Sequence, residues 1–296
     1  MGGPASLTLH AGSNPDISAE RLRDEIVDLL KAIEARYSRY QHDSIVSEIN
    51  RRAGTDEFTE LDAETSSLFA LADQLWHASG GLFDITSGPL RRAWDFRMNG
   101  GADPTHIEPA LSLVGWDRVE WHHNGLRLPE RGMEIDLGGL AKEYAVDCVT
   151  QHLRTAGVTS GVIELAGDVG AIGCRPDGSP WRIGIQSPGE PDSLCTIQLV
   201  DSAIATSGNY ARRIEYAGKH YGHLLNPKSG WPVEGPSSVS VIDSHCLTAG
   251  AVATVACLNR IKEAKNWLEH AALPWLMVSG SGELAGSIAD RMTKDH

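Results

Sequence analysis

One stretch of the sequence, Met133 to Asp147, has a spacing of residue types that could bind a phosphorylated ligand. It reads MEIDLGGLAKEYAVD: an apolar run brings in Asp136, Gly138 and Gly139 make a tight turn, and Lys142 lies in the first turn of an expected helix. Free N–H groups at a helix start, bare glycine backbone and a lysine together favour a di- or triphosphate. The acid before the turn could hold a metal, a ribose hydroxyl or a ring nitrogen. The alternative is a plain Gly-Gly turn before an amphipathic helix with a solvated Lys142, since the stretch is neither a P-loop nor GxGxxG.

Three other polar or aromatic residues lie where chemistry is possible. Asp84, in GGLFDITSGPLRRAW, is flanked by apolar residues, and a buried carboxylate must be paired or hydrogen-bonded. It is therefore either a turn-capping acid or a ligand-binding one. His223, in YGHLLNPKSGWPV, follows a strand-like run and could act as a general base near neutral pH, although a lone histidine is more often structural. Tyr40 follows an expected helix and could stack on a flat ring system, although such an aromatic is usually part of the core.

Helices and strands in mixed order must position these residues. Apolar periodicity predicts about five helices, at 17–37, 63–79, 139–157, 246–258 and 262–270. Asp16 or Ser18 can serve as the N-cap of the first helix, and Gly80-Gly81 can end the second. Short β-prone runs predict strands at 118–121, 161–165, 181–186, 196–200, 203–206, 239–242 and 275–278. The mixed order without regular βαβ alternation predicts an α+β fold, and the lack of a linker predicts one intertwined domain over 1–296.

Composition excludes several classes of function. The 296 residues carry a net charge of −13, which opposes attraction to nucleic acid or anionic lipid. No apolar stretch approaches the roughly 20 residues that cross a bilayer, so no membrane insertion is expected. The start MGGPASLTLH lacks an export signal, which predicts a cytoplasmic chain as written, or an exported one if the N-terminus has been trimmed. The five cysteines lack CxxC spacing and resemble reduced thiols.

Eight stretches, in order from about Ser38 to Thr254, resemble the ApbE family, the FAD:protein FMN transferases. They are SRYQHDSIVSEIN, GLFDITSGPL, IDLGGLAKEYAVD, IELAGDVGAIG, WRIGIQSP, AIATSGNYARR, HLLNPKSGWPV and TAGAVATVA. The resemblance implies an enzyme that splits the FAD diphosphate and attaches FMN, through a phosphoester, to a Ser or Thr hydroxyl of an acceptor flavoprotein. It also implies a divalent cation, usually Mg²⁺. Phosphoryl transfer of this kind needs charge neutralisation, a positioned hydroxyl and a base.

The resemblance also implies roles for individual residues. His223 corresponds to the base that takes the acceptor's proton, and Lys142 lines the FAD site and neutralises the diphosphate. Flavin or FAD contacts are implied for Tyr40, Leu82, Phe83, Asp84, Asp136 and Leu225. Metal contacts are implied for Gly139 and Thr254.

The sequence departs from the family pattern at the expected metal site. The family's usual Ala-Asp-Ala-Leu-Ala-Thr is here Ala-Gly-Ala-Val-Ala-Thr, so Gly250 stands in the place of a ligating aspartate. Positions i and i+4 share a helix face, which leaves Thr254 without its partner. Because Mg²⁺ usually requires at least one carboxylate, this loss predicts weak or absent metal binding. Glu143 also replaces a common glycine, and Glu164 and Ala166 stand where Asn and Gly are common.

Three functions therefore remain open from the sequence. The first is an active FMN transferase with a weak or shifted metal site. The second is a flavin-binding or acceptor-binding protein that has lost catalysis, in which Gly250→Asp should create metal-dependent activity. The third is hydrolysis of FAD to FMN and AMP.

Overall fold

An antiparallel sheet of seven strands lies at the centre of the fold. The protein is seen in a computed structural model that describes residues 3–10, 18–96, 101–190, 192–210 and 212–292. The strand order is β1 (Ala5–His10), β5 (Ser160–Leu165), β6 (Asp168–Ile172), β9 (Ala203–Gly208), β12 (Ser238–Asp243), β13 (Trp275–Val278) and β14 (Leu284–Ala285). Every pair of neighbours is antiparallel. Helices and antiparallel sheets thus occur together, which confirms the α+β class.

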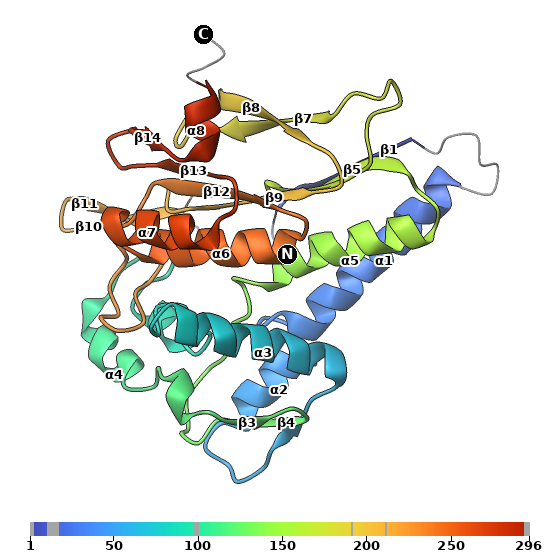
Figure 1. Ribbon diagram of the computed structural model, residues 1–296. Coiled ribbons are helices and arrows are strands. Elements are labelled where there is room, and N and C mark those ends of the chain that lie inside the picture. Colours follow the sequence, from blue (N-terminus) through green and yellow to red (C-terminus); the bar gives the residue numbers. More distant parts are fainter. Residues whose placement is uncertain (1–2, 11–17, 97–100, 191, 211, 293–296) are drawn as a thin grey trace.

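Different layers cover the two faces of this sheet (Figure 1). One face packs against α5 (Ala141–Thr155) and α6 (Cys246–Leu258), with α7 (Ile261–Ala271) beside α6. The ribbon of β7 (Trp181–Gln186) and β8 (Ser193–Leu199) covers the other face together with α8 (Ser287–Met292). A separate apolar cluster fills this second side. Because β6 lies between both layers, all of its residues are buried.

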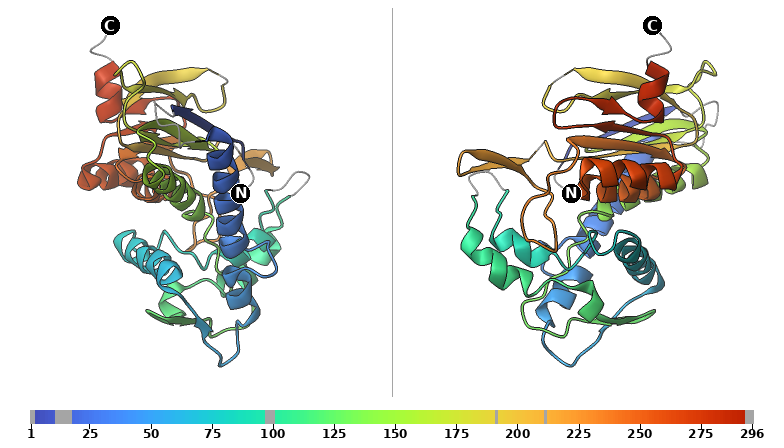
Figure 2. Two further views of the ribbon diagram at one scale, coloured as in Figure 1. Left: turned by 90° about the vertical axis from the view of Figure 1, so that its right-hand side faces the viewer. Right: turned by 60° about the vertical axis from the view of Figure 1, so that its left-hand side comes forward.

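The remaining elements lie largely on the side of α5 and α6 that faces away from the sheet, and the long first helix runs past α5 to reach them (Figure 1). They are α1 (Ala19–Tyr37), α2 (Ile45–Arg51), α3 (Ala63–Ala78), α4 (Ile107–Leu111), a small sheet of β2 (Thr59–Glu60), β4 (Gly125–Arg127) and β3 (Glu120–His122), and the 3-10 turns η1 (Gly88–Arg92), η2 (Pro104–His106) and η3 (Trp116–Arg118). The hairpin of β10 (Arg213–Tyr216) and β11 (Lys219–Gly222) projects from the sheet layer (Figure 2). Tyr216 and Tyr221 of this hairpin contact the buried Trp94.

The expectation of about five helices is wrong, because the described residues form eight. All five expected helices are present, and α6 has the predicted bounds of 246–258. Helix α1 begins after Ser18, whose hydroxyl accepts a hydrogen bond from Arg21 N, while Asp16 and Ile17 lie outside the described residues. The three unpredicted helices, α2, α4 and α8, have seven, five and six residues, too few to show a helical period. No described helix has the length and apolar character needed to cross a membrane.

All seven expected strands are present, and the described residues form seven further strands that were not predicted. The run at 118–121 begins as a strand only at Glu120, because Trp116–Arg118 form a 3-10 turn. Strand β6 escaped prediction because it is buried on both sides, so its sequence DVGAI shows no alternation of polar and apolar residues. The other unpredicted strands are β1, β2, β4, β10, β11 and β14.

A two-residue turn joins β5 to β6 and contains a strained alanine. Ala166 and Gly167 have φ values of 51° and 94°, the left-handed pair that a tight hairpin turn of the I′ type requires. Glycine adopts this conformation freely, whereas a side chain there costs about 1–2 kcal/mol. A glycine at this position, as the resemblance to the ApbE family implies, would adopt the conformation freely, whereas Ala166 carries strain.

We expect Ala166→Gly to raise the free energy of unfolding by about 0.5–1 kcal/mol, since relief of left-handed strain exceeds the extra chain entropy of glycine. Denaturant unfolding measures this change. Ala156→Gly is the matched control, because Ala156 has a φ of −75° and gains no relief. An Ala166→Gly variant no more stable than the unchanged chain would contradict the assigned strain.

Candidate active site

Lys142 and Asp168 form an ion pair where α5 meets the sheet. Asp168 is the first residue of β6, and only 1% of it is exposed. Its Oδ2 pairs with Lys142 Nζ, and its Oδ1 accepts a hydrogen bond from the backbone N–H of Thr206 at 3.0 Å. Lys142 also lies 3.3 Å from Glu143 Oε1. The alternative of a solvated Lys142 is therefore wrong, because two carboxylates hold its ammonium group.

Glu143 occupies the space beside Gly250 on α6. A Cβ atom added to Gly250 would lie 2.3 Å from Glu143 Cγ and 3.0 Å from its carboxylate carbon. Glu143 is 5% exposed, and its Oε2 has no hydrogen-bond partner among the described residues. The glycine thus provides room for a buried carboxylate that reaches across from α5.

Thr254 lies one helical turn after Gly250 and points toward β9. Its Oγ1 is 2.7 Å from Oγ of Ser207, and Thr254 is 8% exposed. Ser207 follows Thr206, whose backbone N–H binds Asp168, so β9 connects Thr254 with the ion pair. We call Lys142, Glu143, Asp168, Ser207 and Thr254 the α5–α6 cluster.

The relative position of α5 and α6 is fixed by Asp147. This residue lies on α5, and its two carboxylate oxygens accept hydrogen bonds from Cys246 N at 2.7 Å and Leu247 N at 2.9 Å. The first residues of a helix have free N–H groups, and the N-cap residue of α6, His245, makes no capping bond with its side chain. Asp147 therefore caps α6 from the neighbouring helix.

The donor set of the α5–α6 cluster fits a hard cation in part. No group of three or more His, Cys, Asp or Glu side chains in the described part of the chain could hold a metal ion. The cluster nevertheless offers two carboxylates and two hydroxyls, the oxygen donors that Mg²⁺ prefers. Oε2 of Glu143 is buried without a hydrogen bond from any described residue, whereas the buried Oδ2 of Asp168 is already paired with Lys142 Nζ. Waters and phosphate oxygens would have to complete the coordination, as is usual for Mg²⁺.

Asp136 belongs to a second group of charges, with Arg39 and Arg91. Its Oδ2 lies 3.3 Å from Arg39 Nη1 and 3.1 Å from Arg91 Nε, and its Oδ1 accepts from Gly138 N at 2.8 Å. Burial raises the pKa of Asp136, but Arg91 and Arg39 outweigh it, so the net pKa lies below the ordinary value. Asp136 is therefore a carboxylate at neutral pH.

Asp84 has the contacts of a structural carboxylate. It accepts hydrogen bonds from Trp76 Nε1, Trp116 N, and both N and Oγ1 of Thr86, at 2.5–3.2 Å. These four donors tie the end of α3 to the loop before η3, which favours the turn-capping interpretation over direct ligand binding.

The other predicted flavin contacts have different environments. The ring of Phe83 lies against Gly139, 3.4 Å from the position of an added Cβ, while Leu82 is half-buried. Tyr40 is 73% exposed, so it is not part of the core, and Arg39 lies over its ring at 5.6 Å. Leu225 is half-buried and bridges to Pro232.

His223 follows β11 directly and has a free ring nitrogen. Its Nδ1 is buried and makes no hydrogen bond with any described residue. Burial lowers the pKa of His223 to about 4, and the charges of Arg212 and Arg91 act in the same direction. The imidazole is therefore neutral at physiological pH. Arg91 pairs with Asp136, and its charge also lowers the pKa of His223.

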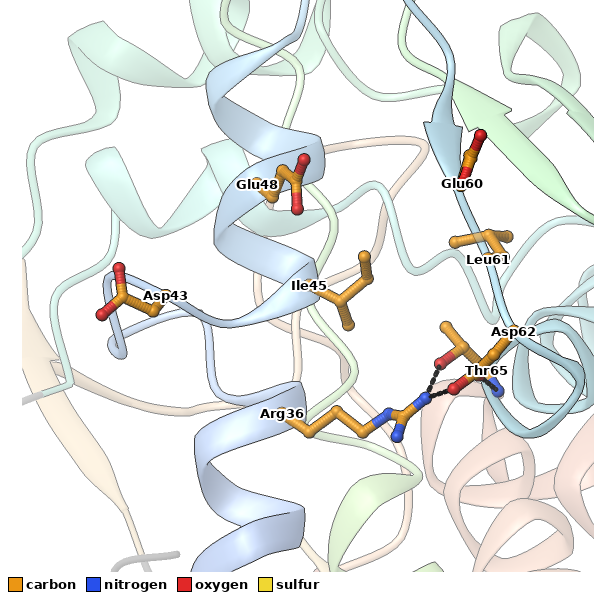
Figure 3. A pocket seen from close by; sticks show the side chains of 8 residues that line it. All are labelled: Arg36, Asp43, Ile45, Glu48, Glu60, Leu61, Asp62 and Thr65. Carbon is orange, nitrogen blue, oxygen red and sulfur yellow. Dashed lines mark hydrogen bonds and ion pairs between the residues drawn. The ribbon is translucent and has the colours of Figure 1, made fainter.

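An open hollow of about 500 Å³ lies elsewhere, between α1, α2 and α3 (Figure 3). Four carboxylates line it, those of Asp43, Glu48, Glu60 and Asp62. The one cation beside them, Arg36, binds Asp62 and Thr65. An excess of negative charge repels a diphosphate. None of the predicted site residues lines this hollow, so we do not assign it to the flavin.

Sequence reasoning missed Arg39, Arg91, Asp168 and Ser207 as members of the site. All four lay within stretches already recognised, but their spacing gave them no role. Asp168 could have been found only through the fold, because it directly follows the two-residue turn of the β5–β6 hairpin, which was not predicted. The two arginines carried no signal, since charges next to a turn are usually solvated.

A sequence model of the ApbE family matches residues 1–277. The chain is 29% identical over 268 residues to the FAD:protein FMN transferase of Vibrio cholerae, with 88% of this chain and 80% of the relative covered. It is 34% identical over 258 residues to the FAD:protein FMN transferase of Chlamydia pneumoniae, with 84% and 80% covered.

Solved structures agree with these sequence matches. The flavin transferase ApbE from Vibrio cholerae superposes with a TM-score of 0.82 at 27% identity, covering 96% of this chain and 98% of that one. The ApbE protein of Thermotoga maritima gives a TM-score of 0.84 at 28% identity, covering 98% and 99%. With a family match over most of its length and these relatives in both sequence and fold, the chain belongs to the ApbE family.

Proposed function

We propose that this protein is an FAD:protein FMN transferase, which splits the FAD diphosphate and attaches FMN to a Ser or Thr hydroxyl of an acceptor flavoprotein. Its family and the named activity of its relatives support the reaction. The observation that carries the proposal is the α5–α6 cluster, in which residues from four separate family stretches meet around Lys142. A half-buried cation beside hard oxygen donors suits phosphoryl transfer, which depends on neutralising charge at the diphosphate.

In the proposed reaction, the acceptor's hydroxyl oxygen attacks the phosphorus on the FMN side. A new P–O bond forms, the P–O bond to the bridging oxygen breaks, and AMP leaves. His223 receives the hydroxyl proton, for which its neutral imidazole is in the correct form. Lys142 stabilises charge on the phosphoryl oxygens. A bound Mg²⁺ would polarise the diphosphate. The ion would be held by Thr254, by the carboxylates of Glu143 and Asp168, and by a backbone carbonyl near Gly139.

The proposed flavin site lies around the turn of Gly138 and Gly139. Tyr40 has an exposed ring that can stack on the isoalloxazine. Leu82, Phe83 and Leu225 offer apolar or backbone contacts. Asp136 accepts a flavin donor while Arg39 and Arg91 balance its charge. We assign Asp84 the shaping of the loop that carries Leu82 and Phe83, because protein donors already saturate its oxygens.

We expect covalent flavin on acceptor fragments that carry a Ser or Thr flavinylation site, when they are mixed with this protein, FAD and Mg²⁺. In-gel flavin fluorescence and the mass of the acceptor measure attachment, and release of one AMP per flavin measures the stoichiometry. Lys142→Met should reduce the rate at least about tenfold, since it removes the cation at the diphosphate. AMP release without an acceptor would instead indicate FAD hydrolysis. The absence of flavinylation at any metal concentration would refute the transferase.

His223→Gln should lower kcat about 10²–10⁴-fold if His223 is the base, with little change in FAD affinity. A base works when deprotonated, so activity rises with pH through its pKa. Because the pKa of His223 is lowered to about 4, kcat/KM should show no inflection between pH 5.5 and 7.5 that depends on His223. Profiles of kcat/KM against pH for both proteins test this. An inflection near pH 6.5 that disappears in the variant would contradict the lowered pKa.

A further inference from the structure

We propose that Glu143 supplies, from α5, the metal-binding carboxylate that the ApbE pattern places on α6 at the position of Gly250. The inference rests on the proposed function and concerns how its cation is held. The glutamate after Lys142 and the glycine on α6 both depart from the family pattern, and the inference explains them together. The metal-binding carboxylate is supplied by α5 instead of α6, so the loss of metal binding that Gly250 alone predicts does not follow.

The first support is that the two side chains cannot coexist in this packing. A Cβ on Gly250 would lie 2.3 Å from Glu143 Cγ and 3.2 Å from Oε1. A carboxylate at position 250 would thus begin in the space that Glu143 fills. The carboxylate carbon of Glu143 lies 3.0 Å from that Cβ position, so the carboxylate from α5 is close to the place where a side chain at position 250 would start.

The second support is that Glu143 is buried with an unused oxygen. Its side chain is 6% exposed, and Oε2 makes no hydrogen bond to any described residue. A buried carboxylate costs several kcal/mol unless it is paired and hydrogen-bonded. Lys142 approaches Oε1 only to 3.3 Å and already pairs with Asp168. Two carboxylates sharing one lysine leave a local excess of one negative charge, which a divalent cation would reverse.

The third support is the chemistry of the surrounding donors. Thr254 lies on the same face of α6 as Gly250, and its hydroxyl is 2.7 Å from that of Ser207. Asp168 Oδ2, which pairs with Lys142 Nζ, is a further buried oxygen beside Glu143. These are hard oxygen donors of the kind that select Mg²⁺ or Mn²⁺ over softer metals. A carboxylate from Glu143 therefore restores the type of ligand that Gly250 removes.

The competing explanation is that Glu143 is only a counter-ion for Lys142. Glu143→Gln separates the two roles, because it keeps the shape and hydrogen-bonding oxygen of the side chain but removes the charge needed to bind a cation. If Glu143 serves Lys142 alone, metal affinity stays unchanged. If it is a ligand, metal affinity falls.

The test measures binding of Mn²⁺ alone to the full chain, by electron paramagnetic resonance of free Mn²⁺ and by the Mn²⁺-dependent shift in the unfolding temperature. We expect Glu143→Gln and Glu143→Gly to weaken Mn²⁺ binding at least tenfold. The double variant Glu143→Gly with Gly250→Asp should recover to within about threefold of the unchanged chain, since it returns the carboxylate to α6. Gly250→Asp alone should destabilise the protein and bind Mn²⁺ no more tightly. Glu263→Gln, which removes an exposed carboxylate on α7, is the matched control and should change nothing.

Equal Mn²⁺ affinity in the unchanged chain and in Glu143→Gln would overturn the proposal. A double variant that folds normally, as judged by circular dichroism, but binds as weakly as Glu143→Gly would overturn the exchange as well. Because the readout is metal binding, its outcome is independent of flavin transfer. Metal binding through Glu143 without flavinylation would count against the transferase alone, and flavinylation with an unaffected Glu143→Gln would count against this inference alone.

Discussion

Two buried carboxylates that share one lysine are the constraint on which this site depends. Glu143 and Asp168 are 5% and 1% exposed, and Lys142 contacts both. One cation cannot fully compensate two desolvated negative charges. The surrounding structure maintains this imbalance: the β5–β6 hairpin fixes Asp168, the first turn of α5 carries Lys142 and Glu143 together, and Gly250 leaves space for the glutamate. A site with excess buried negative charge beside hydroxyls is prepared for a small, hard cation.

Such a cluster needs helices held at a fixed separation, and the chain provides this through backbone contacts. Asp147 accepts hydrogen bonds from the first two N–H groups of α6, so the face that carries Gly250 and Thr254 is held in register against α5. On the sheet side, Asp168 accepts from Thr206 N, which joins the hairpin to β9. Binding geometry of this precision comes from rigid elements rather than from loops. The residues that we propose to face the flavin lie on loops, where Asp84 and Asp136 provide the corresponding order.

Elements with a long apolar pattern could be predicted from the sequence, whereas a strand that is buried on both faces could not. Helix α6 has its predicted bounds because thirteen small or apolar residues permit little else, whereas β6 was missed because both of its faces are covered. Lys142 and Thr254 were expected in one site, and both lie in the α5–α6 cluster. Glu143 was visible only as a departure from a pattern. Its relation to Gly250 is a contact across two helices, 107 positions apart in the chain, and spacing along a sequence carries no information on that distance.

The contact between Glu143 and Gly250 also constrains how the two arrangements of this site can interconvert during evolution. Starting from the family pattern, a glutamate gained first on α5 meets the aspartate of α6, whose Cβ would be 2.3 Å from the new side chain. A glycine gained first on α6 leaves neither carboxylate in place. We therefore expect either substitution alone to be harmful, although the two together are compatible. The first of these conflicts is steric. If the carboxylate is exchanged between the helices as we propose, unfavourable single substitutions separate the two arrangements, so the residues at positions 143 and 250 should change together.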